Sequence, residues 1–169
     1  ITRMGSQVKI LFICHGNTCR SPMAEALART IAERAGRRDL SFASAGIAPR
    51  SEGGPADPRA VACIGNRGID LSGHTVRALD AEADGRGFDL LLALDEAVLG
   101  TVRGRVPVRY LHKVRPLMSF ARGTGMTEVP DPYEGTARDY DDALGLIQLA
   151  IEGVLAADLK PALPREDAP

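Results

Sequence analysis

The chain has 169 residues and a formal net charge of −1, with 21 basic and 22 acidic side chains. This length suits one domain with a well-buried core, and the near-neutral charge gives no support for nucleic-acid binding. The longest apolar runs are too short to cross a bilayer, so no membrane insertion is expected. The three cysteines Cys14, Cys19 and Cys63 lack the even, dense spacing of a disulfide scaffold. They favour a reducing compartment and predict a cytoplasmic protein.

Strand and helix patterns alternate along the first part of the chain. Continuous apolar runs indicate strands covered on both faces, whereas apolar residues every three or four positions indicate helices. The predicted elements are a strand over 8–13, a helix over 22–36, a strand over 40–45, an irregular loop over 46–56 at the rim of the site, and a helix over 57–67.

The same patterns continue downstream. The predicted elements there are a short helix over 72–79, a strand over 90–94, a short helix opened by Asp95, an edge strand over 106–111, a long loop over 112–132 and a helix over 137–159. The alternation implies a single-domain, doubly wound α/β fold, with a four-stranded parallel sheet and helices on both faces. The domain is predicted to span residues 7–160, with loosely ordered termini over 1–6 and 161–169.

The stretch Cys14-His15-Gly16-Asn17-Thr18-Cys19-Arg20-Ser21-Pro22 joins the first predicted strand to the first predicted helix. The first amides of a helix are unpaired and the macrodipole is positive there, so such a loop is suited to bind an anion. Arg20 follows Cys14 after five residues, and this spacing lets the loop curl around one tetrahedral oxyanion while the guanidinium closes the ring. Cys14 would lie beneath the bound phosphorus. These groups should lower the Cys14 pKa from about 8.5 into the roughly 3.5–7.5 range of activated cysteines.

The other residues of this loop have supporting roles in the same interpretation. Gly16 lets the backbone approach the anion, and Asn17 tolerates left-handed dihedral angles while its amide ties the loop together. Ser21 can hydrogen-bond the Cys14 thiolate, and Pro22 fits the first helical turn. The predicted phosphate-binding residues are His15, Gly16, Asn17, Thr18, Cys19 and Arg20.

Residues 8–27, and above all the stretch from Cys14 to Pro22, resemble the low-molecular-weight protein tyrosine phosphatases. Later motifs look like those of the family in the same order: Ser44-Ala45-Gly46, Asp57-Pro58-Arg59-Ala60, residues 68–74, Phe88-Asp89-Leu90 with Asp95, and Pro130-Asp131-Pro132-Tyr133. The resemblance spans about residues 7–158. It implies hydrolysis of phosphotyrosine-type monoesters through a phosphocysteine on Cys14, without cofactor or metal. The substrate would be a phosphorylated protein or a small phosphate ester, and inorganic phosphate the product.

The resemblance also implies roles for residues far from the loop. Asp131 would protonate the leaving group and then activate water, although Pro-Asp-Pro-Tyr is also a plain turn signal. Ser44 and His74 would tie the loop into its curled shape, and a purely structural histidine explains His74 equally well.

Two charged residues mark the predicted pocket wall. Counting along the chain places Arg50 where the family commonly has a tryptophan or another apolar residue, and Glu134 where a second tyrosine often follows. Tyr133 would be the remaining aromatic face. Arg50 can pair with Glu134, and Glu134 would repel acidic groups beside a phosphotyrosine. We therefore expect a weak preference for aryl over alkyl phosphates and poor turnover of acidic phosphopeptides.

Two other functions stay open at this point. An arsenate reductase on the same fold needs further cysteines to resolve the arsenylated thiol, and outside the loop the chain offers Cys63, in a predicted helix. A non-catalytic phosphoprotein-binding module would need neither the Cys14 nucleophile nor the Asp131 acid. A metal site is not expected, because the sequence lacks a cysteine-histidine cluster or a two-histidine helical motif.

Overall fold

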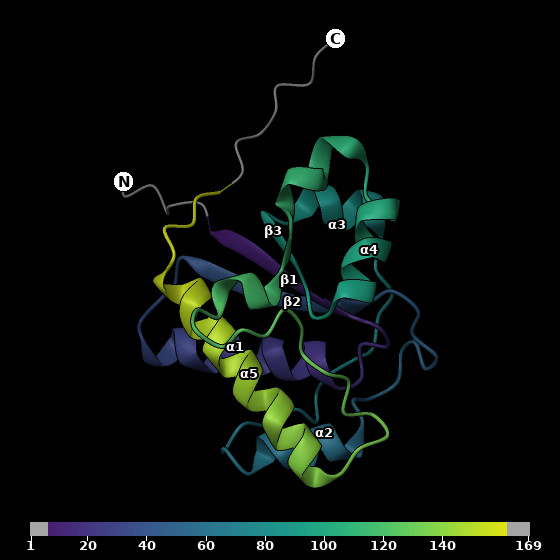
Figure 1. The fold of residues 1–169 in the computed structure, drawn as a ribbon, viewed down its shortest axis with the longest axis vertical. Coiled ribbons are helices and arrows are strands. Elements are labelled where there is room, and N and C mark those ends of the chain that lie inside the picture. The colour runs from purple at the N-terminus through teal and green to yellow at the C-terminus, as the bar shows by residue number, and fades with distance from the viewer. Residues whose placement is uncertain (1–6, 162–169) are drawn as a thin grey trace.

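Four chain segments form one parallel sheet in the computed structural model, which describes residues 7–161. The strands are β1 (Val8–Cys14), β2 (Leu40–Gly46), β3 (Leu90–Ala93) and β4 (Val114–Pro116), and they lie in the order β2-β1-β3-β4 (Figure 1). β1 pairs with β2 on one side and β3 on the other, with Cys14 opposite Gly46. The strand order reverses next to β1. Ligands in folds of this kind bind at such a reversal, beyond the carboxyl ends of the strands.

Helices cover both faces of the sheet. One face carries α1 (Arg20–Arg34), α2 (Pro58–Gly65), α5 (Ala137–Ala156) and a 3₁₀ helix, η2 (Leu117–Phe120). The other face carries α3 (Ala81–Gly87), α4 (Glu96–Arg105) and a second 3₁₀ helix, η1 (Val108–Lys113). Among the described helices, none has the length and apolar character needed to cross a membrane.

Alternate residues of β1 pack into the two layers. Ile10 and Phe12 belong to the core beneath α1 and α5, whereas Leu11 and Ile13 belong to the core beneath α4. All four side chains are fully buried, and each such burial stabilises the fold by about 1.5–3 kcal/mol. Burial on both faces explains why this strand reads as a continuous apolar run.

The fold class predicted from the sequence is confirmed. The strands predicted over 8–13, 40–45 and 90–94 are present, and so are the four helices that the sequence places near Pro22, Asp57, Asp95 and Ala137. Pro22 lies in the first turn of a helix, as predicted, because α1 begins at Arg20. Residues 1–6 and 162–169, most of the predicted loose termini, lie outside the described residues.

The edge strand predicted over 106–111 is wrong. Val106 follows the last turn of α4, and Val108–Lys113 forms η1, in which the Tyr110 amide donates to the Pro107 carbonyl. Lys113 holds this segment against α3, since its buried ammonium donates to the carbonyls of Gly85 and Phe88 at 2.8 Å each. The fourth strand is β4, and it lies, with η2, inside the region predicted as a long loop.

The helix predicted over 72–79 is also wrong. Residues of this segment are held in turns and extended backbone by distant partners: the Arg77 amide donates to Asn17 Oδ1, and the Arg77 carbonyl accepts from the Gly46 amide. A single parallel bridge joins Gly46 to Ala78. The helix that sequence patterns missed is α3, which begins at the Asp80 cap.

Candidate active site

The loop between β1 and α1 curls tightly at the carboxyl end of the sheet. Asn17 lies at its centre with φ of 56°, a left-handed conformation that asparagine adopts more readily than most residues. Its Nδ2 donates to Ser21 Oγ at 2.9 Å and to Ser44 Oγ at 3.0 Å, and its Oδ1 accepts from the Arg77 amide at 3.0 Å. His74 Nε2 lies 2.9 Å from the Asn17 carbonyl, and because that oxygen can only accept, Nε2 carries the proton. Two distant segments, β2 at Ser44 and residues 74–77, therefore fix the curl of the loop.

Gly46 allows this loop to lie against β2. A Cβ at position 46 would come within 2.9 Å of the Asn17 nitrogen, the Gly16 carbonyl carbon and the His15 carbonyl oxygen. Three backbone contacts this short leave no room for a side chain. The Ser44-Ala45-Gly46 motif thus supplies both a tether for Asn17 and the space that the loop needs.

Cys14 presents its sulfur at the base of the loop. The Asn17 amide donates to Sγ at 3.3 Å, and Ser21 Oγ lies 2.9 Å from Sγ. Ser21 Oγ accepts from the Asn17 side chain, and its own proton has two acceptors within reach, the sulfur at 2.9 Å and the Ala45 carbonyl at 3.5 Å. These contacts hold the sulfur in one position, below the loop amides.

Arg20 is the first residue of α1, and its side chain lines the cavity together with residues of the loop. Its side chain is 3% exposed; Nη1 donates to Asp95 Oδ2 at 2.7 Å and to the Val129 carbonyl at 2.8 Å, while Nη2 lies 3.5 Å from Asp131 Oδ2. Asp95 also caps α4, since its Oδ1 accepts from the Val98 amide at 2.7 Å. Sequence reasoning gave Asp95 no place in the site. The available signal was its position directly beyond β3, the strand that pairs with β1.

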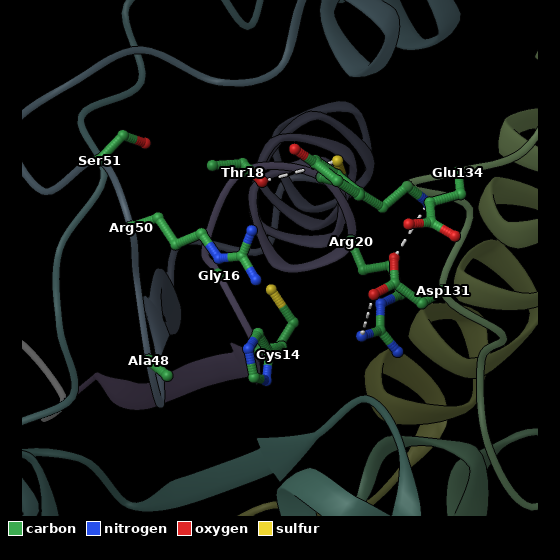
Figure 2. A pocket seen from close by; sticks show the side chains of 12 residues that line it. Cys14, Gly16, Thr18, Arg20, Ala48, Arg50, Ser51, Asp131 and Glu134 are labelled. Atoms are coloured by element: carbon green, nitrogen blue, oxygen red, sulfur yellow. Dashed lines mark hydrogen bonds and ion pairs between the residues drawn. The ribbon is translucent and has the colours of Figure 1, made fainter.

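A cavity of about 270 Å³ opens above the Cys14 sulfur (Figure 2). Its lining consists of Cys14, His15, Gly16, Thr18, Cys19, Arg20, Ala48, Arg50, Ser51, Asp131, Tyr133 and Glu134. Of the predicted site residues, Asn17, Ser21, Ser44 and His74 are absent from this lining; the hydrogen bonds that connect them support the loop from behind. Ala48 and Ser51 line the cavity without having been predicted.

The two walls of the cavity come from distant segments. Figure 2 shows Arg50 reaching in from the loop after β2, on the side opposite Asp131 and Glu134, which precede α5. Asp131 is 49% exposed on its side chain, and its Oδ1 accepts from the Tyr133 amide at 3.1 Å. The ion pair between Arg50 and Glu134 that the sequence allowed is not formed.

Arg59 is a second residue that sequence reasoning did not assign to the site. Its guanidinium pairs with Asp57, which accepts from it at 2.9 Å, and lies over the rings of Tyr133 at 5.1 Å and Tyr140 at 5.3 Å. These are cation–π distances. Tyr140 in turn contacts Cys19, with 3.4 Å between Oη and Sγ. Burial raises the pKa of the Cys19 thiol, although the contact with Tyr140 opposes the shift.

Cys63 lies away from the cavity, in α2. Its thiol donates to Asp141 Oδ1 at 3.3 Å. Burial, together with this carboxylate, raises the pKa of Cys63 to about 11. The thiol therefore stays protonated at neutral pH.

The α/β fold, with a cysteine at the end of β1 and an arginine at the start of α1 lining one cavity, has the arrangement expected of a cysteine-dependent phosphatase. The profile of the family described as low molecular weight phosphotyrosine protein phosphatase matches residues 9–164. The chain belongs to this family.

Individual relatives agree with this assignment. A low molecular weight protein-tyrosine-phosphatase of Streptomyces coelicolor is 40% identical over 153 residues, which cover 88% of this chain and 92% of the relative. The crystal structure of YfkJ from Bacillus subtilis matches with a TM-score of 0.84 at 31% identity, over 91% of this chain and 96% of YfkJ. YwlE arginine phosphatase, in a mutant with a phosphorylated active site serine, matches with a TM-score of 0.80 at 32% identity, over 89% of this chain and 97% of YwlE. YwlE, like YfkJ, comes from Bacillus subtilis.

Proposed function

We propose that Cys14 is the nucleophile of a phosphomonoester hydrolase and that its sulfur forms the phosphocysteine. The observation that carries this proposal is the position of Sγ at the base of the cavity, held by the Asn17 amide and Ser21, with the buried Arg20 guanidinium beside it. Phosphoryl transfer spreads negative charge over three equatorial oxygens. The loop amides and Arg20 are placed to bind these oxygens while the sulfur attacks phosphorus from below.

Asp131 is the proposed acid and base. In the first step the S–P bond forms, the bond from phosphorus to the ester oxygen breaks, and Asp131 gives its proton to that oxygen. In the second step water attacks phosphorus, Asp131 takes a proton from the water, and the S–P bond breaks to release inorganic phosphate and the Cys14 thiolate. Its place on the cavity wall, with Tyr133 orienting one oxygen, supports both roles.

The two alternative functions find less support. Cys63 is buried in α2 and protonated at neutral pH, so it is poorly placed to resolve an arsenylated Cys14. A pure binding module has no use for a cavity that places a nucleophile and a carboxylic acid together. Hydrolysis therefore accounts for more of the site than either alternative.

Substrate and location are proposed in coarser terms. The relatives named protein-tyrosine-phosphatases support phosphotyrosine in proteins as the substrate of this chain, and a small phosphate ester is a further candidate. Phosphoarginine is a second candidate, because a matching structure is an arginine phosphatase and because Asp131 and Glu134 form an acidic wall that suits a guanidine leaving group. The free thiols of Cys14, Cys19 and Cys63 support a cytoplasmic location, where thiols stay reduced.

Initial rates on an aryl phosphate, a phosphotyrosine peptide and a phosphoarginine peptide test this function. Cys14→Ser should lose about a thousandfold or more in kcat on all three. Asp131→Asn should lose about 10²–10⁴-fold on esters with poor leaving groups and much less on p-nitrophenyl phosphate, and the basic limb of its pH profile should disappear. Folding of each variant is checked by circular dichroism. A folded parent protein that turned over none of the three substrates would contradict the proposal.

A further inference from the structure

Arg50 is a charged cavity residue that the proposed mechanism does not use. It is exposed to solvent and lines the same cavity as Cys14 and Arg20, and its guanidinium extends toward Cys14 (Figure 2). Within residues 7–161 it forms no ion pair or hydrogen bond with another side chain. Arg20, by contrast, already contacts Asp95 and Asp131. Among the described residues, Arg50 is therefore the arginine of the cavity lining that has no side-chain partner.

Charges of opposite sign face each other across the cavity. Arg50 stands alone on the wall formed by residues 48–51, whereas Asp131 and Glu134 stand on the wall that precedes α5. A phosphoryl group held by the loop leaves room for a substituent of the ester to lie toward one wall or the other. An anionic substituent is attracted by Arg50 on one wall and repelled by Glu134 on the other, so the substituent's position decides the sign of its effect.

We propose that Arg50 forms a second anion-binding position beside the phosphate loop, and that the preferred substrates are phosphate monoesters with a second anionic group, a carboxylate or phosphate, close to the ester. The planar guanidinium is suited to bind either group through two parallel hydrogen bonds. This inference rests on the phosphatase function proposed above. It differs from the expectation that acidic phosphopeptides are turned over poorly, in which Glu134 repels the acidic group; here the acidic group lies toward Arg50.

The first experiment uses two esters of matched shape, 3-carboxyphenyl phosphate and 3-carbamoylphenyl phosphate. The parent protein should hydrolyse the carboxylate with about three- to tenfold higher kcat/KM, a range set by a charge pair that is partly exposed to solvent. Arg50→Gln should lose this preference, Arg50→Lys should keep part of it because the charge remains without the planar fork, and Arg50→Glu should reverse it. Raising the salt concentration should reduce the preference of the parent protein.

Arg38→Gln is the matched control. Arg38 is an exposed arginine at the opposite end of β2, just before the strand begins, so its replacement removes the same charge far from the cavity. Arg38→Gln should leave the ratio of kcat/KM for the two esters the same as in the parent protein. The proposal would be overturned if Arg50→Gln lowered kcat/KM by the same factor on both esters and also weakened inhibition by inorganic phosphate. That result would mean that Arg50 binds the phosphoryl group itself.

A second arm identifies the source of the second anion. Phosphotyrosine pentapeptides carry glutamate or glutamine directly before or directly after the phosphotyrosine. If glutamate at one of the two positions raises kcat/KM, and Arg50→Gln abolishes this increase, the substrate is a protein with an acidic residue beside the phosphotyrosine. If only the small esters show the preference for a carboxylate, the substrate is a small molecule with two anionic groups. Equal rates for the two esters and for all peptides would overturn the inference, while a complete absence of hydrolysis would instead contradict the proposed function.

Discussion

The buried pair between Arg20 and Asp95 shows how a single residue outside the cavity sets the geometry inside it. Asp95 and the Val129 carbonyl both bind Nη1 of Arg20, so the remaining donors of the guanidinium point toward the cavity. A buried guanidinium without a carboxylate partner is costly, and removing one member of such a pair leaves the other uncompensated. Asp95 is therefore a positioning residue for Arg20.

Replacing Asp95 by asparagine separates its two roles. Asparagine is as good a helix cap as aspartate, so the start of α4 should be kept while the charge pair with Arg20 is lost. We expect kcat/KM on an aryl phosphate to fall by about 10- to 100-fold, because the guanidinium loses its fixed orientation. Asp80→Asn is the control, since Asp80 caps α3 through the Ala83 amide and makes no contact with Arg20. Similar small losses in both variants would show that Asp95 acts as a cap alone.

Residues within the loop between β1 and α1 could be placed from the sequence because their spacing is local. Cys14 and Arg20 are separated by a fixed short loop between a strand and a helix, and Asn17 is a residue type that suits its left-handed conformation. Asp95 and Arg59 could not be placed in this way. Each reaches the site only after β3 or α2 has packed, so tertiary structure brings them there.

At the scale of elements, α2 connects the two halves of the site. The amide of its cap, Asp57, donates to the Thr18 carbonyl in the loop between β1 and α1 at 2.9 Å. In the first turn of the helix, Arg59 lies over the ring of Tyr133 on the cavity wall. The same short helix therefore contacts both the loop between β1 and α1 and the segment that carries Asp131.

The pair between Asp57 and Arg59 makes the stability of this helix depend on pH. Hydrogen bonds from the Arg59 side chain, and then from its amide, lower the pKa of Asp57 in the folded protein. The folded protein thus binds this proton more weakly than the unfolded chain, in which the pKa is about 3.9. The resulting stabilisation is present above about pH 4 and is lost as the pH falls through the lower, folded pKa.

Asp57→Asn should therefore be less stable than the parent protein near neutral pH, and the difference should shrink as the pH falls below about 4. The effect should be modest, since Arg59 is partly exposed to solvent. Urea unfolding at several pH values measures it. The control is Asp142→Asn, an exposed aspartate on α5 that forms no ion pair within the described residues. If the difference in free energy of unfolding between the parent protein and Asp57→Asn stayed constant with pH, the Asp57 carboxylate would not be the group that makes stability depend on pH.

Which elements could be predicted depends on whether local or distant contacts decide them. β1 and α1 follow from an apolar run and a helical repeat, and burial on both faces makes the first signal strong. Residues 106–111 include two valines that favour a strand. In the structure, Pro107 instead precedes the first turn of η1, and the buried Lys113 holds η1 against α3 through its hydrogen bond to the Gly85 carbonyl. Ser72 is a plausible helix cap, yet hydrogen bonds from distant residues keep the backbone after it extended.

At the scale of the whole molecule, the sheet order explains why the site lies where it does. β1 is central, with β2 and β3 on either side, so the loops that follow β1 and β2 line the cavity and the segment after β3 contacts Arg20. The loop after β2 brings Arg50, and the end of β3 brings Asp95. The long connection from β4 to α5 completes the cavity with Asp131. Side chains more than a hundred residues apart thus form one site at one end of the sheet.

Chemical trapping of the intermediate tests the central claim most directly. In Asp131→Ala the first step with p-nitrophenyl phosphate should proceed without an acid, because the leaving group is good, while the second step lacks its base. Acid quenching followed by intact-mass and peptide mass spectrometry should then show one added phosphoryl group, located on Cys14, together with a burst of p-nitrophenol. Release of p-nitrophenol without modification of Cys14, or with phosphate on another residue, would contradict the phosphocysteine mechanism.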